Sequence, residues 1–400
     1  MKKTLFALGF VAMISTTLVK AQSKLHISEH LFQVDALNEE KYISFTKKQL
    51  KGSQFILIGE QHGIKEVGVF TNAMYRLAEN YGYKTLCIET DALAAEKIMT
   101  LSDGVNTLDK ARKLYGDFPF AIPFYGNEDD YELFKKVVQT QGNIWGIDQT
   151  FMVQFRMNFD HISKTTKSKK LKKKVLELKL KAERAFEQAL ATKDFNGNYI
   201  FQYDESTHTE LLDLAENEQE KEVFRQFWKT KEIYAYNNLS KEYYKNNNVR
   251  GQLMKENFMR YYREAEKNTA TPKVIFKLGA NHAAKGLTRT NIYDIGNLAN
   301  ELAISRGNTS KHYMVVGLSG KATTGNPFTP DPVISFDNSK QLPKELQDMQ
   351  ATFTKKYIVL NVAALRPYAY GKRYSEDLKK LIFGYDVLVL VNNAEAVRSF

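Results

Sequence analysis

Short apolar runs separated by an amphipathic segment constrain the fold of this chain more than any other feature of its sequence. Residues 54–58 and 84–88 are as short and as apolar as buried strands usually are. Between them, over residues 66–80, apolar side chains recur at helical spacing, at Val67, Phe70, Met74, Leu77 and Ala78. A strand, a helix and a second strand form a βαβ unit, whose two strands lie parallel. The sequence therefore predicts an α/β fold.

Similar runs later in the chain extend the predicted sheet. Strands are expected at residues 143–147, 273–278, 312–318, 356–362 and 386–391. Residues 150–268, by contrast, are rich in charge and nearly free of Gly and Pro, with helical periodicity at 176–190, 210–228 and 252–265. We therefore predict an α/β domain with a mainly parallel central sheet flanked by helices. Its two parts are residues 22–149 and 271–400, and a helical insertion at 150–270 separates them.

The first residues have the pattern of a secretory signal peptide. Lys2 and Lys3 precede an apolar run at residues 5–14, and Val19-Lys20-Ala21 matches a cleavage site with small side chains. The run is shorter than the roughly 20 apolar residues that a membrane-spanning helix needs. We predict that residues 1–21 are a signal peptide cleaved after Ala21. The mature protein, without a membrane span, is then periplasmic or secreted.

Charge and cysteine content narrow the possible partners. The chain has a formal net charge of +11, and much of the excess lies in a lysine-rich run at residues 164–174. Such a run binds nucleic acid or anionic lipid in some proteins, but we expect a solvated helix face or loop here and no nucleic-acid partner. With a single cysteine, Cys87, the chain forms no internal disulfide and no Cys-rich metal site, so any metal needs His and carboxylate ligands.

Ionisable side chains follow several of the predicted strands directly. Glu60 and His62 come after the first strand, Glu89 after the second, Asp148 after the third, and His282 after the run at 273–278. Ligands of open α/β sheets bind outside the carboxyl ends of the strands, and the flanking glycines allow the sharp turns needed there. The two histidines share a Gly-x-x-His spacing. We therefore expect both imidazoles to meet acidic neighbours in one site.

These residues resemble the erythromycin esterase-like proteins. The motifs that carry the resemblance extend from about residue 56 to residue 286 and are Gly59-Glu60-x-His62-Gly63, Glu89, Gly146-x-Asp148, the segment at 249–257 and Gly279-Ala280-Asn281-His282-Ala283. The resemblance implies a hydrolase that acts on a small-molecule ester, and the predicted signal peptide implies that this hydrolase is exported. The same superfamily includes the ChaN haem-binding lipoproteins and the Tiki-type proteases, which imply a haem or iron-binding protein without turnover and a metal-dependent peptidase as alternatives.

The residues themselves favour activated water as the nucleophile. The Gly-x-Ser-x-Gly motif is absent, and Cys87 lies in the middle of a predicted strand, where an inert core thiol is expected. His62 is the candidate base, with Glu89 or Glu60 on its far ring nitrogen. Glu89 and His282 then position the water or protonate the leaving alkoxide. In this hypothesis Arg250 stabilises developing negative charge, because guanidinium stays ionised and offers forked donors.

Substrate binding is assigned to Asp148 and Asn281, and each assignment at the site has a structural alternative. Arg250 pairs with a surface carboxylate in that alternative, Asp148 caps a helix that begins near Thr150, and Glu60 is purely structural. The aromatic segment at residues 118–125 is expected to pack in the core, and a pocket wall is its alternative.

No cofactor is expected for ester hydrolysis by activated water. The alternatives are a divalent metal held by His62, His282 and either Glu60 or Glu89, and a haem bound through a Tyr or His ligand. The sequence predicts neither the oligomeric state nor the substrate within the ester class.

Overall fold

The computed structural model describes residues 26–325, 332–371 and 373–400. The predicted signal peptide at residues 1–21 lies outside the described residues. Among those residues, no helix has both the length and the apolar character needed to cross a bilayer.

An eight-stranded sheet in the order β1-β9-β10-β6-β2-β5-β3-β4 forms the centre of the molecule. The strands from β10 to β4 all pair parallel, and only β9 runs against its neighbours. The strands are β1 (Leu31–Val34), β2 (Ser53–Glu60), β3 (Thr85–Ile88), β4 (Asn143–Gly146), β5 (Val274–Gly279), β6 (Thr309–Gly317), β9 (Tyr357–Leu360) and β10 (Val387–Val391). The predicted α/β class with a mainly parallel sheet is confirmed.

Every strand predicted from an apolar run is present, within a few residues of its expected bounds. The sequence analysis missed β1, which pairs only with β9 at the sheet edge, and the hairpin of β7 (Ser319–Thr323) and β8 (Val333–Asp337). None of these three strands contains the long apolar run that predicts a buried strand. The side chains of β8, for example, are largely exposed. Strand detection by hydrophobicity therefore worked where the strand is buried on both faces.

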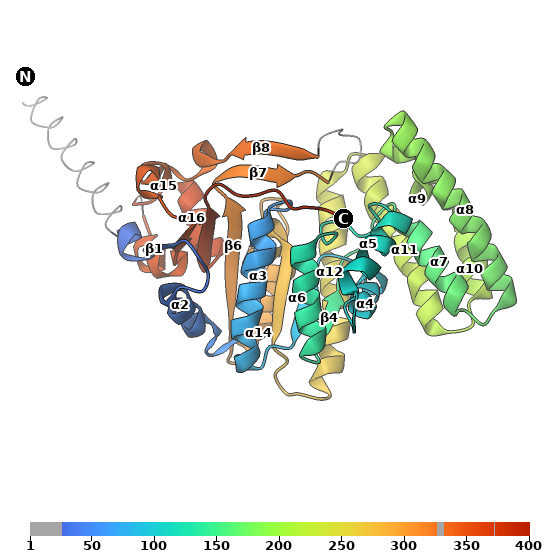
Figure 1. The fold of residues 1–400 in the computed structure, drawn as a ribbon, viewed down its shortest axis with the longest axis horizontal. Coiled ribbons are helices and arrows are strands. Elements are labelled where there is room, and N and C mark those ends of the chain that lie inside the picture. The colour runs from blue at the N-terminus through green and yellow to red at the C-terminus, as the bar shows by residue number, and fades with distance from the viewer. Residues whose placement is uncertain (1–25, 326–331, 372) are drawn as a thin grey trace, which may run out of the picture.

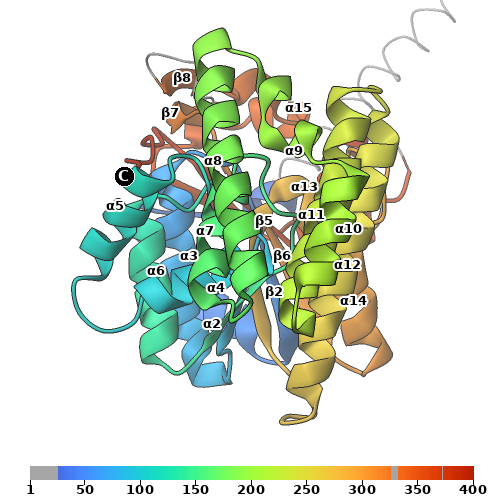
Figure 2. The ribbon, with the colours of Figure 1, turned by 90° about the vertical axis from the view of Figure 1, so that its right-hand side faces the viewer.

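Helices cover both faces of the sheet, as parallel strands require. One face packs against α2 (Glu40–Leu50), α3 (Lys65–Ala78), α5 (Thr107–Asp117) and α6 (Glu128–Gln139). The other packs against α12 (Tyr243–Glu266) and α14 (Ile295–Ser305), which share a cluster with β2 and β5, and against α16 (Glu376–Gly384) near β10. α14 also contacts β6. Figure 2 shows α12 and α14 on the side of the sheet opposite α3 and α6. Adjacent strand residues alternate between these two cores.

The chain between β4 and α12 forms a helical segment beside the sheet (Figure 1). This segment has a hydrophobic cluster of its own. It contains α7 (Phe155–Thr165), α8 (Lys169–Thr192), α9 (Tyr199–Gln202), α10 (Glu205–Leu214) and α11 (Glu218–Asn238). The single helix expected over 210–228 is wrong, because α10 ends at Leu214 and Asn217 caps α11 by accepting a hydrogen bond from the Glu220 N–H. The domain boundaries drawn at 149/150 and 270/271 stay predictions.

The lysine-rich run lies at the end of α7 and in the first turns of α8. Its side chains are mostly exposed, and two of them pair with acidic neighbours, Lys164 with Asp160 and Lys174 with Glu210. The remaining α-helices of the described residues are α4 (Ala92–Leu101), α13 (Ala280–Ala283) and α15 (Lys344–Gln347).

Candidate active site

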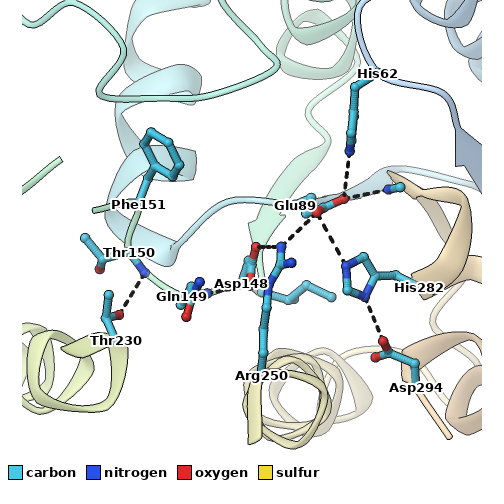
Figure 3. A network of polar contacts seen from close by, with 12 residues as sticks. His62, Glu89, Asp148, Gln149, Thr150, Phe151, Thr230, Arg250, His282 and Asp294 are labelled. Carbon is cyan, nitrogen blue, oxygen red and sulfur yellow. Dashed lines mark hydrogen bonds and ion pairs between the residues drawn. The ribbon is translucent and has the colours of Figure 1, made fainter. Parts of the chain in front are cut away.

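The strand order brings the predicted site residues together. β5 lies between β2 and β3, and β4 pairs with β3, so the carboxyl ends of these four parallel strands are neighbours. His62 follows β2, His282 lies in α13 after β5, Glu89 follows β3, and Asp148 follows β4. Figure 3 shows the four side chains and Arg250, from α12, converging at this edge of the sheet.

Glu89 is the centre of this cluster. Its Oε1 accepts a hydrogen bond of 2.8 Å from Arg250 Nη2, and its Oε2 accepts one of 2.5 Å from the Gly279 backbone N–H. The Nε2 atom of His282 lies 3.5 Å from Oε1, and the Nε2 atom of His62 lies 3.8 Å from Oε2. Burial by itself raises the pKa of Glu89, but the positive charges of His282, His62 and Arg250 outweigh it and lower that pKa well below its usual value. Glu89 is therefore ionised.

His282 lies between two buried carboxylates. Its Nδ1 is 2.7 Å from Asp294 Oδ2, and Nε2 faces Glu89. Burial alone would lower the pKa of His282, but attraction to Glu89 and Asp294 exceeds that effect and raises the pKa to about 10. The imidazole is thus a cation at neutral pH, which makes it a proton donor and a source of positive charge. It is not a base.

Asp294 is a site residue that the sequence analysis missed. It caps α14, with Oδ1 accepting a hydrogen bond from the Ile295 N–H, and its other oxygen is left for His282. An Asp directly before a helical run is a recognisable cap signal. The cap signal predicts the position of Asp294 at the start of a helix, but it does not predict the contact with His282.

His62 is held in one orientation by two contacts. Its Nδ1 lies 2.8 Å from Glu60 Oε1, and its ring stacks on Phe124 with centroids 3.8 Å apart and planes 10° apart. A carboxylate partner fixes the proton on Nδ1 in the neutral ring, so Nε2 carries the lone pair. The His62 side chain is 31% exposed, whereas Glu60 is almost completely buried. The next residue, Gly63, has a φ of +84°, which favours glycine and lets the chain turn sharply off β2.

A buried lysine forms an ion pair with Glu60. Lys277 Nζ, in β5, lies 2.8 Å from Glu60 Oε2 and 3.3 Å from Asp130 Oδ1, and all three side chains are almost inaccessible. Burial raises the pKa of Glu60, but the charges of Lys277 and His62 outweigh burial and lower the pKa. Tyr125 joins this support to Glu89, since its hydroxyl accepts from the Glu89 N–H and donates to the Lys277 carbonyl. Lys277 and Asp130 were not predicted from the sequence, although a lysine inside the otherwise apolar strand β5 is a signal for such a group.

Arg250 and Asp148 form a pair, and the structural alternatives for both are wrong. Arg250 lies within α12 and donates to Asp148 through Nε at 2.9 Å and through Nη2, while Nη2 also reaches Glu89. Its partners are buried, so this is not a surface ion pair. Asp148 caps no helix near Thr150, because α7 begins only at Phe155. Burial opposes the charge of Arg250, but attraction to Asp148 exceeds it and raises the pKa further.

A cavity of about 1360 Å³ opens onto this cluster. His62, Glu89, Arg250, Asn281 and His282 line it, and Asn281 is exposed there. The aromatic segment at 118–125 has both predicted roles, since Phe118 and Tyr125 are in the core, whereas Phe124 lines the cavity and stacks on His62. Space for a substrate therefore lies beside the side chain of His62, the less buried of the two histidines.

The donor set at this site does not fit a divalent cation. Within residues 26–325, 332–371 and 373–400, no three His, Cys, Asp or Glu side chains are arranged to hold a metal ion. The oxygens of Glu89 face a guanidinium and a backbone N–H, and those of Glu60 face His62 and an ammonium group. A cation among these groups would meet Arg250, Lys277 and the His282 imidazolium.

Comparison of the sequence with protein-family models gives no match, and no curated protein matches it. Solved structures do share the fold. A mutant of the erythromycin esterase EreC in its open conformation is 14% identical, with 90% of this chain and 95% of that chain covered and a TM-score of 0.56. A succinoglycan biosynthesis protein is 12% identical, with 95% and 98% covered and a TM-score of 0.60.

A protein from Bacillus cereus is also similar, with 13% identity, 95% of this chain and 99% of that chain covered, and a TM-score of 0.56. All three similarities extend over nearly the whole chain, including the C-terminal part that the motif resemblance left out. The chain therefore has an erythromycin esterase-like fold, as its motifs predicted.

Proposed function

We propose that this chain is an exported hydrolase that cleaves an ester with a water molecule deprotonated by His62. The observation that carries the proposal is the pairing of His62 Nδ1 with buried Glu60, which leaves Nε2 as the lone-pair nitrogen of a residue that lines the cavity. A base needs an accessible lone pair, and a buried carboxylate on the far nitrogen stabilises the imidazolium that forms. Export rests on the signal-like residues 1–21.

The two histidines have different roles in this proposal. His62 takes a proton from water as the water attacks the ester carbonyl, and Glu60 stabilises the charge gained by the ring. His282 carries its proton at neutral pH because its pKa is about 10, so it stabilises the developing oxyanion and donates a proton to the leaving alkoxide. One residue thus supplies the base and the other the acid.

Arg250 contributes a fixed positive charge at the cavity wall. Nε and Nη2 are engaged by Asp148 and Glu89, but Nη1 has no hydrogen-bond partner in the part of the chain that the structure describes. This remaining donor is available for the tetrahedral intermediate. Asp148 then acts by orienting Arg250, and direct substrate binding is left to Asn281.

The choice of water as the nucleophile is supported by the state of the single cysteine. Cys87 is fully buried within the sheet, and burial raises the pKa of its thiol well above the usual value. The choice of an ester is supported by the fold, since EreC is by name an erythromycin esterase. Fold similarity at this level of identity leaves the substrate itself open.

His62→Asn is the variant that tests the proposal. Initial rates with a panel of p-nitrophenyl esters should fall by a factor of about 10² to 10⁴, the usual contribution of a general base, with an unchanged circular dichroism spectrum. His208→Asn is the matched control, because His208 also stacks on an aromatic ring, Trp228, but lies outside the cavity. Wild-type rates from folded His62→Asn would remove His62 as the base.

Treatment with a chelator separates this proposal from the alternatives. We expect the ester hydrolysis rate to be unchanged after dialysis against EDTA, with no stoichiometric metal in the purified protein. Loss of activity that zinc or manganese restores would favour a metal-dependent peptidase, and a Soret band would favour haem capture.

A further inference from the structure

We propose that one arm of the cavity binds an unbranched hydrocarbon chain, so that the substrate is an ester with a long aliphatic group on one side. The arm is formed by Met314 and Val316 of β6, which are partly buried, and by Leu388 and Leu390 of β10, which are each only 2% exposed. All four line the same cavity as His62 and Glu89. The statement that the substrate is an ester rests on the proposed ester hydrolysis. The arm itself rests on the packing of the C-terminal strands.

The register of the two strands makes these four side chains one continuous surface. β6 and β10 pair parallel, with Leu388 beside Met314 and Leu390 beside Val316. Alternate residues of a strand point to opposite faces of the sheet. The intervening residues Tyr313, Val315, Val387 and Val389 belong to the core on the α3 side. The four apolar side chains therefore share the opposite face, on which α14 and α16 lie.

The helices on that face leave part of this surface uncovered. α14 packs on β2 and on β6, where Ser310 near the start of β6 donates a hydrogen bond to Asn300 of α14, and α16 packs in the cluster that includes Leu388 and Leu390. Met314 and Val316 lie further along β6, towards its carboxyl end. Met314 and Val316 are only partly buried, and so are Leu342 and Leu381, which line the same cavity. The same elements also bring Gln341 and Lys380 to the cavity lining, so the apolar part of the arm is the aliphatic surface of β6, Leu342 and Leu381. A hydrocarbon chain complements that aliphatic surface and a polar group does not.

A short connection joins the arm to the proposed catalytic turn. Gln61 lies between Glu60 and His62, and its backbone N–H donates to the Val315 carbonyl at 3.0 Å. Its side-chain Oε1 accepts from the Gly317 N–H at 3.1 Å. The end of β6 is thereby fixed directly beside the turn that carries the base. A chain lying over Val316 consequently continues from an ester group placed at His62.

The opposite wall of the cavity is polar. Gln149, Tyr234, Asn237 and Asn246 line it on the side of Arg250. The cavity therefore combines an apolar arm with a wall of hydrogen-bonding groups, and its volume of about 1360 Å³ exceeds the roughly 300–1,000 Å³ of ordinary small-molecule pockets. An ester with one aliphatic and one polar side matches both walls.

The test compares methyl acetate with methyl octanoate and octyl acetate, which carry the chain on either side of the ester. Acid release in a pH-stat gives kcat/KM for each. We expect at least one octyl substrate to exceed methyl acetate, by about fourfold per buried methylene, since about 0.8 kcal/mol per methylene corresponds to that factor. Val316→Phe should bring the ratio of long to short substrate close to one.

Val105→Phe is the matched control, because Val105 is 77% exposed and does not line the cavity. Its ratio should equal that of the wild type. If Val316→Phe does not fold, Val316→Thr keeps the shape and adds a hydroxyl group, and it should lower the ratio several-fold. Equal kcat/KM values for all three esters, or an unchanged ratio in folded Val316→Phe and in Val316→Thr, would overturn the hydrocarbon arm while leaving ester hydrolysis intact.

Calorimetric titration with 2-undecanone distinguishes failure of the arm from failure of the proposed function. This ketone has the carbonyl and the chain but no leaving group. If the wild type cleaves none of the esters but binds the ketone, and Val316→Phe binds it at least tenfold more weakly, the hydrolysis proposal fails and the arm stands. If the wild type binds no ketone and shows no chain-length preference, the arm is refuted.

Discussion

Replacing His282 by Gln removes the imidazolium between Glu89 and Asp294, and the resulting change in stability should depend on pH in a defined direction. The folded state raises the pKa of His282 from 6.5 to about 10. A raised pKa means that the folded protein binds this proton more tightly than the unfolded chain does. The contribution to stability is therefore complete below pH 6.5 and is lost as the pH rises towards and through 10.

The pKa shift of His282 sets an upper limit on the unfolding free energy that the His282→Gln substitution removes. At 1.36 kcal/mol per pKa unit, the difference between 6.5 and about 10 gives about 5 kcal/mol at low pH. The same linkage leaves about 4 kcal/mol at pH 7 and about 0.4 kcal/mol at pH 10. The difference in unfolding free energy between wild type and His282→Gln should thus shrink by up to about 3.5 kcal/mol over this range. Changes in packing contribute equally at every pH, so they cancel when the stability difference at one pH is compared with that at another.

Urea unfolding of both proteins at pH 7, 8.5 and 10 measures this difference. His208→Gln is the control, because burial lowers the pKa of His208 and the ring is neutral throughout this range. Its difference from the wild type should be constant. A difference between wild type and His282→Gln that is also constant from pH 7 to 10 would mean that His282 is neutral in the folded protein, and the assignment of His282 as the acid would be wrong.

Three further changes test the groups that support the site. Lys277→Met leaves Glu60 and Asp130 buried without their cation, so urea unfolding at pH 7 should show a loss of about 3–5 kcal/mol. That loss should diminish at lower pH, where the carboxyls are protonated, and a pH-independent loss would contradict the ion-pair explanation. Gly146→Ala places a Cβ 2.1 Å from the Asp91 carbonyl oxygen, and we expect thermal unfolding to show a destabilisation of about 1–3 kcal/mol. Phe124→Ala removes the ring on which His62 stacks, but Phe124 is 40% exposed. It should therefore lower kcat/KM for ester hydrolysis several-fold with little change in melting temperature, and an unchanged kcat/KM would show that the stack does not orient the base.

The sequence allowed the sheet to be predicted more accurately than the helices. Strands buried on both faces are continuous apolar runs, so β2, β3, β5 and β10 were recognisable one by one. Surface helices give a weaker signal, and the break between α10 and α11 was missed because it depends on a single cap at Asn217. β1 and the β7–β8 hairpin were missed since neither is a long apolar run.

For the site, the sequence indicated which residues follow strand ends but not how they pair. It indicated that a carboxylate would hold His62, without deciding between Glu60 and Glu89, and the structure has Glu60 at 2.8 Å and Glu89 at 3.8 Å. It gave no pairing for His282, whose partner Asp294 is also a helix cap. The pairing of His282 with Asp294 and the distance from His62 to Glu89 depend on how separate segments of the chain pack against one another.

The sequence by itself determined the elements and the chemistry available at their ends: apolar runs that become parallel strands, glycines that permit sharp turns, and two histidines among carboxylates. Only the tertiary structure decided that β5 lies between β2 and β3, which brings His282 to Glu89 across 193 residues of chain. The tertiary structure also decided the protonation states of Glu89 and His282, because a pKa depends on burial and on nearby charges rather than on neighbours in sequence. For this reason two histidines with the same Gly-x-x-His spacing differ: one is held by Glu60 and partly exposed in the cavity, and the other is a buried cation.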